Sequence, residues 1–144
     1  MKRLEYIQST GSQFIDTGVS GAVEIEAQFK ITTTPSGWSA IIWAENSGSP
    51  WGCNGVRYGP SNFQLGQGGT SAYSISINTT TLYTFKAITN PSNYYLKVND
   101  SNAISGSNAN SLTSYSLYLF ANHQVNKATH YSKIQLYYCR IYSE

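Results

Sequence analysis

The sequence predicts an all-β fold, a sandwich or barrel of antiparallel strands, and composition and turn spacing lead to that prediction. Ser, Thr, Asn and Gln make up 52 of the 144 residues, and there are 12 Tyr and 12 Gly against only eight Leu. This composition disfavours helices and favours strands and turns. Turn-rich segments recur between short apolar stretches, and no window shows capped helical spacing over three turns.

Strict alternation of apolar and polar residues marks the clearest strand, Val23–Ile31. Its odd-numbered residues are apolar and its even-numbered ones polar, as in an antiparallel strand with one buried face. We expect Ile25 and Phe29 on that face, and Leu119 in a later strand, to be buried. Eight further strands are expected, at 38–45, 55–58, 63–66, 73–77, 82–89, 94–99, 116–122 and 133–142.

The first eighteen residues contain two short apolar-bearing units, 6–8 and 13–16, separated by a Gly-containing stretch at 9–12. We expect two short strands joined by a turn, which would protect an otherwise exposed sheet edge. The Asn- and Ser-rich segment 99–114 suits a connection that crosses between sheets better than a hairpin.

The N-terminal residues also carry a family resemblance. Leu-Glu-Tyr-Ile-Gln-Ser-Thr-Gly at 4–11, followed by Gln-Phe-Ile-Asp-Thr-Gly at 13–18, resembles the start of a laminin-G-like, concanavalin A-like jelly-roll domain. Such domains occur in gut bacterial surface proteins and in phage or prophage structural proteins, and 117–121 and 133–142 are similar to their closing strands. The resemblance implies that residues 1–144 form one jelly-roll domain of two antiparallel sheets. The chain is then either a trimmed module of a longer protein or a stand-alone version.

Charge and hydropathy narrow the set of partners. Only 11% of the residues are charged, the net charge is +2, and Lys and Arg are scattered, so we expect no nucleic-acid binding. The apolar runs 40–44 and 117–121 are too short to span a bilayer. Glu5, Gln8, Ser9 and Gly11 leave no apolar run behind Lys2-Arg3, so we expect no signal peptide of the chain's own. We expect a location on a virion or at the extracellular or cell surface, and virion proteins reach the outside by lysis without a signal peptide.

The stretch Trp-Gly-Cys-Asn-Gly-Val-Arg-Tyr-Gly at 51–59 is the candidate glycan site. Sugar-binding sites stack a pyranose on an aromatic ring and fix its hydroxyls with a few polar groups. Trp51 follows Pro50 in a loop, whereas Trp38 and Trp43 lie in expected strands. The alternative is that Trp51 packs in the core and Arg57 shields the sheet. The expected ligand-binding residues are Trp51, Asn54, Arg57, Tyr58 and Gln64.

We expect no catalytic residues. Glu24 and Glu26 are same-face carboxylates about 7 Å apart along one strand, near the separation that glycosidases use. The hydrolase pattern needs a third acid at the next alternating position, but position 22 is Ala and position 28 is Gln. A solvated strand face is therefore favoured over a hydrolase site.

We expect no metal site and no cofactor. His123 and His130 have no acids or cysteines at zinc spacing. Calcium is the alternative, through Asp16, Asp100 and loop carbonyls, but two aspartates favour roles in turns.

Cys53 and Cys139 lie far apart in the sequence, and without an export signal buried free thiols are favoured over the alternative, a single disulfide.

The predicted function is a non-catalytic carbohydrate-binding or adhesion module of a phage or gut bacterial surface structure, with a glycan as its partner. The alternative is a structural virion protein, a decoration or fibre component that binds other protein subunits.

Overall fold

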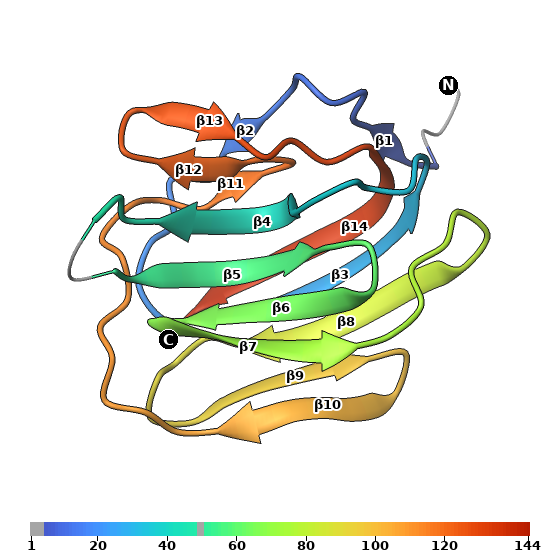
Figure 1. Cartoon of the computed structure of the whole chain (residues 1–144). Helices are drawn as coiled ribbons and strands as arrows, with labels where there is room; N and C mark the ends of the chain where they lie inside the picture. The colour runs from blue at the N-terminus through green and yellow to red at the C-terminus, as the bar shows by residue number, and fades with distance from the viewer. Residues whose placement is uncertain (1–4, 49–50) are drawn as a thin grey trace.

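The computed structural model describes residues 5–48 and 51–144, and in these ranges the regular structure is fourteen strands and no helix (Figure 1). No helix in the described ranges could therefore span a membrane. The strands are β1 (Ile7–Gln8), β2 (Ile15–Asp16), β3 (Val23–Ile31), β4 (Ser39–Glu45), β5 (Cys53–Tyr58), β6 (Asn62–Gln67), β7 (Gly69–Ser74), β8 (Leu82–Ile88), β9 (Tyr94–Val98), β10 (Ser101–Gly106), β11 (Tyr118–Leu119), β12 (Asn122–Gln124), β13 (Lys127–Thr129) and β14 (Ile134–Ser143).

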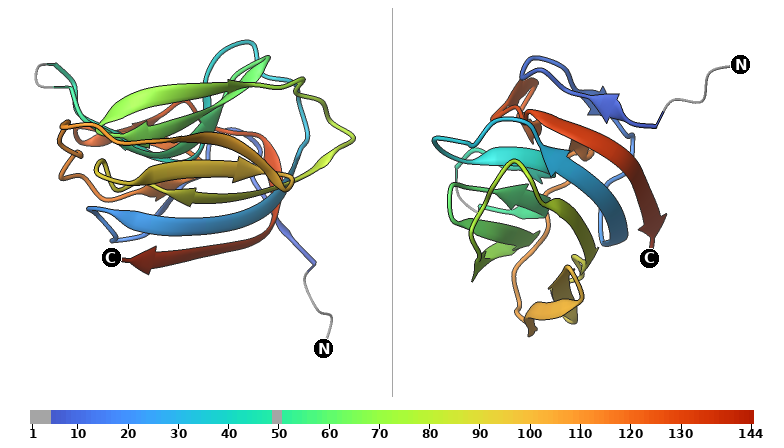
Figure 2. Two further views of the ribbon diagram at one scale, coloured as in Figure 1. Left: turned by 90° about the horizontal axis from the view of Figure 1, so that it is seen from below. Right: turned by 90° about the vertical axis from the view of Figure 1, so that its right-hand side faces the viewer.

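The strands form two sheets that pack face to face, as the edge-on views in Figure 2 show. Sheet A has the order β1-β14-β3-β8-β9-β10. Sheet B has the order β13-β12-β4-β5-β6-β7, and the short β11 pairs with both β4 and β2. Neighbouring strands are antiparallel apart from the parallel pair β4 and β12. The predicted all-β, two-sheet antiparallel sandwich is confirmed.

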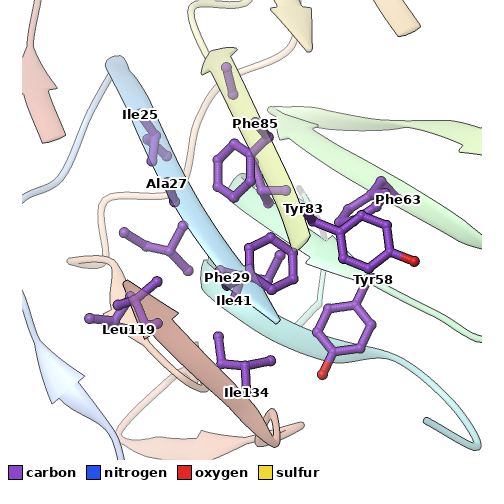
Figure 3. Packing of buried hydrophobic residues seen from close by; sticks show 14 of the residues in the cluster. Ile25, Ala27, Phe29, Ile41, Tyr58, Phe63, Tyr83, Phe85, Leu119 and Ile134 are labelled. Atoms are coloured by element: carbon purple, nitrogen blue, oxygen red, sulfur yellow. The ribbon is translucent and has the colours of Figure 1, made fainter. Parts of the chain in front are cut away.

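The core lies between the sheets and is centred on β3, whose odd-numbered side chains are fully buried and whose even-numbered ones are half-buried. The Phe29 ring has four aromatic neighbours at centroid distances between 5.7 and 6.3 Å (Figure 3). Ile25 and Leu119 are buried as well. The predicted buried face of β3 is confirmed. The aromatic neighbours of Phe29 are Tyr58, Phe63, Tyr83 and Phe85.

The two N-terminal strands exist, but they do not pair with each other as the sequence predicts. β1 pairs with β14 in sheet A, and β2 pairs with β11 in sheet B. The reason lies at Ser9, whose N–H donates to the Ile134 carbonyl at 2.9 Å and whose hydroxyl donates to the Ser132 carbonyl at 2.7 Å. These two bonds hold the segment along the approach to β14, so it bridges the two sheets instead of closing a hairpin.

The segment 99–114 is not the single crossing connection that its composition predicts, and the first half of that prediction is wrong. Asn99 and Asp100 both have positive φ, 46° and 67°, the backbone that a two-residue hairpin turn requires. They join β9 to β10, which is a hairpin strand at the edge of sheet A. Only the residues after Gly106 cross to sheet B, where the chain resumes at β11.

Candidate functional site

Arg57 lies at the centre of the candidate site, on the face of sheet B turned away from the core. Along β5, Val56 and Tyr58 belong to the core cluster, so the alternating Cys53 and Arg57 point to the opposite side. In register, Arg57 has Gln64 of β6 beside it. The period of two thus places a guanidinium and an amide next to each other on the outer face.

The Arg57 guanidinium is held between two indole rings. Its Cζ atom lies 4.6 Å from the ring centroid of Trp38 and 4.3 Å from that of Trp43. Nε donates to Gln64 Oε1 at 2.6 Å, and Nη1 lies 3.4 Å from Glu45 Oε2. Arg57 is only 9% exposed, and this burial lowers the pKa of its guanidinium, a shift that the neighbouring Glu45 opposes. The guanidinium is therefore a fixed support for both rings.

The Glu45 carboxylate connects this stack to the rest of sheet B. It accepts hydrogen bonds from Trp43 Nε1 at 2.9 Å and from Asn122 Nδ2 at 2.8 Å. The Trp43 indole packs over Gly66 of β6. A Cβ at position 66 would come within 2.8 Å of the ring. Trp43 is fully buried in a small cluster separate from the main core. A buried polar network thus fixes the geometry of the stack.

Trp38 also borders a pocket of about 450 Å³, between the β3–β4 connection and residues 130–133. We call it the Trp38 pocket. Its aromatic border is half-buried Trp38 and Tyr131, and its volume is typical of small-molecule sites. The lining also holds the hydroxyl-bearing Thr33, Thr34, Ser36 and Ser39, together with His130, Lys133 and Tyr58.

Trp51 lies in a different pocket, at the other end of β4. Trp38 directly precedes this strand, whereas Trp51 belongs to the connection that follows it. A seven-residue strand spans about 20 Å, so the two indoles are far apart. Trp51 is 44% exposed and, with Asn46 and residues 109–112, borders a pocket of about 270 Å³ that we call the Trp51 pocket.

The structure therefore divides the five residues expected to bind ligand. Arg57 and Gln64 are in contact on the outer face, while Trp51 stands apart at the end of the sheet. Asn54 is fully buried on the inner face and donates to the Gly21 carbonyl at 2.7 Å. Tyr58 packs in the core, is 1% exposed and lines the Trp38 pocket.

Sequence reasoning misses Trp38, Glu45 and Tyr131 as members of the site. The local pattern puts Trp38 in a strand and hence in the core, although it precedes β4 and stacks on Arg57. Because successive side chains of a strand point to opposite faces, the alternation along 53–58 already places Arg57 on the other face from Asn54 and Tyr58. The pairing of Trp38 with Arg57 depends on the register of β4 against β5, which contains a bulge between Ala40 and Ile42.

The carboxylates considered for catalysis lie on the outer face of sheet A. The Lys86 ammonium lies 2.6 Å from a Glu24 oxygen and 3.5 Å from a Glu26 oxygen, and Arg140 lies 3.6 Å from Glu26. The Glu24 and Glu26 side chains are 30% and 26% exposed and ion-paired, as on a charged strand face. These acids contribute nothing to the Trp38 pocket.

The histidines and aspartates considered for metal binding have local partners. His123 stacks on Tyr118 at a centroid distance of 3.8 Å. Asp16 accepts hydrogen bonds from the Ser116 hydroxyl and the Gly18 N–H, which lower the pKa of its carboxyl, and Asp100 lies in the β9–β10 turn. Within residues 5–48 and 51–144, no group of three or more His, Cys, Asp or Glu could hold a metal ion.

The two thiols, Cys53 and Cys139, are free. Burial raises the pKa of Cys53 from its ordinary 9.0 to about 12 and that of Cys139 to about 11. We expect a thiol reagent at about pH 8 to leave Cys53 unmodified in the folded protein and to modify both cysteines in denaturant. Because only the unfolded chain ionises these thiols near pH 9, their contribution to stability is complete below pH 9 and falls above it. Rapid modification of Cys53 in the folded protein would contradict the expected protection of this thiol.

The sequence matches no family model and no curated protein. Solved structures share its fold. The Ruminococcus gnavus IT-sialidase CBM40 superposes with a TM-score of 0.74 at 10% identity, over 96% of this chain and 90% of that chain. The same CBM40 has been solved bound to α2,3 sialyllactose.

Two sialidases are similar over part of their length. The K499G mutant of NanB sialidase from Streptococcus pneumoniae has a TM-score of 0.73 at 13% identity, over 96% of this chain. The Trypanosoma rangeli sialidase in complex with sialic acid has a TM-score of 0.62 at 15% identity, over 84% of this chain. This chain spans 25% and 20% of those two chains, respectively. At these identities the likeness shows a shared β-sandwich fold, consistent with the jelly roll that the N-terminal resemblance implies.

Proposed function

We propose that this chain is a non-catalytic carbohydrate-binding module and that the glycan binds in the Trp38 pocket. The half-buried Trp38 indole carries the proposal, because Arg57 fixes it from one side and it borders a pocket of about 450 Å³. The fold likeness to a CBM40 solved with sialyllactose supports the same class of ligand.

The pocket offers the two kinds of contact that sugars use. The Trp38 ring supplies an apolar surface for the C–H face of a pyranose. Hydroxyl groups on the β3–β4 connection, together with Tyr131 and His130, supply donors and acceptors for the sugar hydroxyls. Since the stack on Arg57 already orders the indole, binding loses little side-chain entropy there.

The lining of the pocket supports binding without hydrolysis. Glycoside hydrolysis generally uses two carboxyl groups on either side of the scissile bond. The residues that line the Trp38 pocket include no Asp and no Glu. The nearby Glu45 carboxylate is buried and occupied by Arg57, Trp43 and Asn122.

The N-terminal resemblance supports a setting in a phage or gut bacterial surface structure, and hence a location on a virion or a cell surface.

The Trp51 pocket is a second candidate position for the glycan, because its indole is 44% exposed and the Asn110 amide lines the same pocket. A structural virion protein is the second candidate function, and a cluster of exposed apolar side chains beside β14 favours it.

Trp38→Ala is expected to weaken glycan binding at least about tenfold, or about 1.4 kcal/mol, because the stacking surface is lost. An array of neutral and sialylated glycans identifies the sugar, and calorimetric titration of that sugar measures the affinity. Trp51→Ala, which removes an exposed indole from the other pocket, is the matched control and should bind unchanged. A loss confined to Trp51→Ala would move the site to the Trp51 pocket. A wild-type chain that binds no glycan on the array would refute the proposed function.

A further inference from the structure

Exposed apolar side chains gather beside β14. Among the described residues, eight large hydrophobic side chains are exposed: Tyr6 and Ile7 lie at β1, Tyr137 and Tyr142 on β14, and Phe14 and Ile15 at β2 of sheet B, with Trp51 and Leu82 elsewhere. The Tyr6 and Tyr137 rings are 5.7 Å apart and, with Ile7, border a pocket of about 380 Å³ that is otherwise lined by apolar and aromatic side chains and Glu5. No other large hydrophobic side chain in the described ranges is exposed. Contiguous exposed apolar surface is typical of interaction sites.

The same region contains an unpaired strand edge. β14 has ten residues, but β1 covers only Leu136 and Gln135. From Tyr138 to Ser143, β14 pairs with β3 in unbroken register on one side, and no described strand pairs with its other side. We call residues 138–143 the β14 edge. Its backbone N–H and C=O groups are a template for another strand, and it contains neither Pro nor Lys, which commonly block such pairing.

We propose that two copies of this chain associate through their β14 edges, paired antiparallel about a two-fold axis. A two-fold axis brings the same strand of each copy together, so the edge must be complementary to itself. The pairing centred on Arg140 uses residues 138–142, beyond the two residues of β14 that β1 pairs with. It places Tyr138 opposite Tyr142 of the second copy, and Cys139 opposite its Ile141.

These pairs match in character. Cross-strand aromatic pairs stabilise antiparallel sheets, and the two Tyr138–Tyr142 pairs form on the outer face. Cys139 and Ile141 are half-buried against the core, so their pairing continues the apolar layer between the sheets. The two Arg140 side chains meet at the axis, and Glu26 of the same copy, 3.6 Å away, offsets the charge of each.

The association joins the two A sheets into one continuous sheet and leaves the Trp38 pocket of each copy free. The β14 edge and the Trp38 pocket share no residue. A dimer would carry two such pockets and gain affinity for clustered glycans by multivalency, without any new contact to the sugar.

Sedimentation velocity of the full chain, from about 1 µM to about 1 mM, tests the dimer directly. Tyr142→Lys should raise the dimer dissociation constant at least about tenfold, since it removes both aromatic pairs and places an ammonium near Arg140. Leu82→Lys is the matched control, because Leu82 is 46% exposed outside this region and Tyr142 is 50% exposed. Both variants should keep the wild-type melting temperature at low concentration, where the chain is monomeric.

Hydrogen exchange identifies the surface. The amides of the β14 edge that face away from β3 should exchange fast in dilute protein and slowly at high concentration. A chain that remains monomeric throughout, or a dimer equally affected by Tyr142→Lys and Leu82→Lys, would overturn the proposal. Because these measurements contain no sugar, their failure would leave the carbohydrate-binding proposal unaffected.

Discussion

Phe29→Ala is expected to lower the free energy of unfolding by about 3–5 kcal/mol. Phe29 is 0% exposed, and its ring contacts four other aromatic rings drawn from both sheets. Truncation removes a large apolar side chain and leaves a cavity that β3, paired on both sides, cannot close. Chemical denaturation monitored by tryptophan fluorescence measures the change.

Phe14→Ala is the matched control for that experiment. Phe14 is 45% exposed, and its ring stacks on Tyr118 at 4.6 Å, outside the core cluster. We expect a loss of about 1 kcal/mol or less. If Phe29→Ala cost no more than Phe14→Ala, the assignment of the buried face of β3 would be wrong.

Glu45→Ala is expected to destabilise the protein by about 3–5 kcal/mol, because it leaves a buried guanidinium without its counter-charge. The side chains of Arg57 and Glu45 are 11% and 8% exposed, so water replaces the lost carboxylate poorly. Trp43 Nε1 loses its acceptor in the same step, and Asn122 Nδ2 loses one of its two. Thermal and chemical unfolding measure the loss. Glycan binding should weaken as well, since Trp38 rests on Arg57.

Glu24→Ala is the matched control for Glu45→Ala. It removes the same kind of side chain, but from a surface ion pair with Lys86, whose side chain is 42% exposed. Water screens that pair, so we expect a much smaller effect than for Glu45. Equal effects of the two substitutions would show that the Arg57 network contributes no more than an ordinary surface pair.

The fold is largely predictable because the alternation in β3 reflects its environment directly. Alternation over Val23–Ile31 indicates both the bounds of the strand and its buried face. Where both faces of a strand are half-exposed, that pattern is absent. β10 reads Ser-Asn-Ala-Ile-Ser-Gly and has no fully buried residue, so its sequence predicts a loop. The pairing of β1 with β14 and of β2 with β11 depends on contacts about a hundred residues or more apart, which no local pattern encodes.

The candidate site is predictable only in part. The Gly-rich stretch 51–59, which contains β5, identifies Arg57, and Gln64 follows shortly after it on β6; these two side chains do meet. Position in a loop favours Trp51 over Trp38, yet Trp38 is the half-buried indole that the register of β4 and β5 brings onto Arg57, on which the fully buried Trp43 also stacks. Local composition finds the polar members of such a site, whereas its aromatic support comes from tertiary structure.

A two-dimensional ¹⁵N–¹H NMR titration tests the central claim most directly, because each of the three tryptophans contributes one indole N–H resonance. The ligands are α2,3-sialyllactose, lactose and the best glycan from the array. We expect saturating shifts of the Trp38 resonance with at least one of these sugars, while the Trp51 resonance stays in place. Shifts of Trp51 with Trp38 unmoved, or no shift of any indole resonance, would contradict glycan binding at the Trp38 pocket.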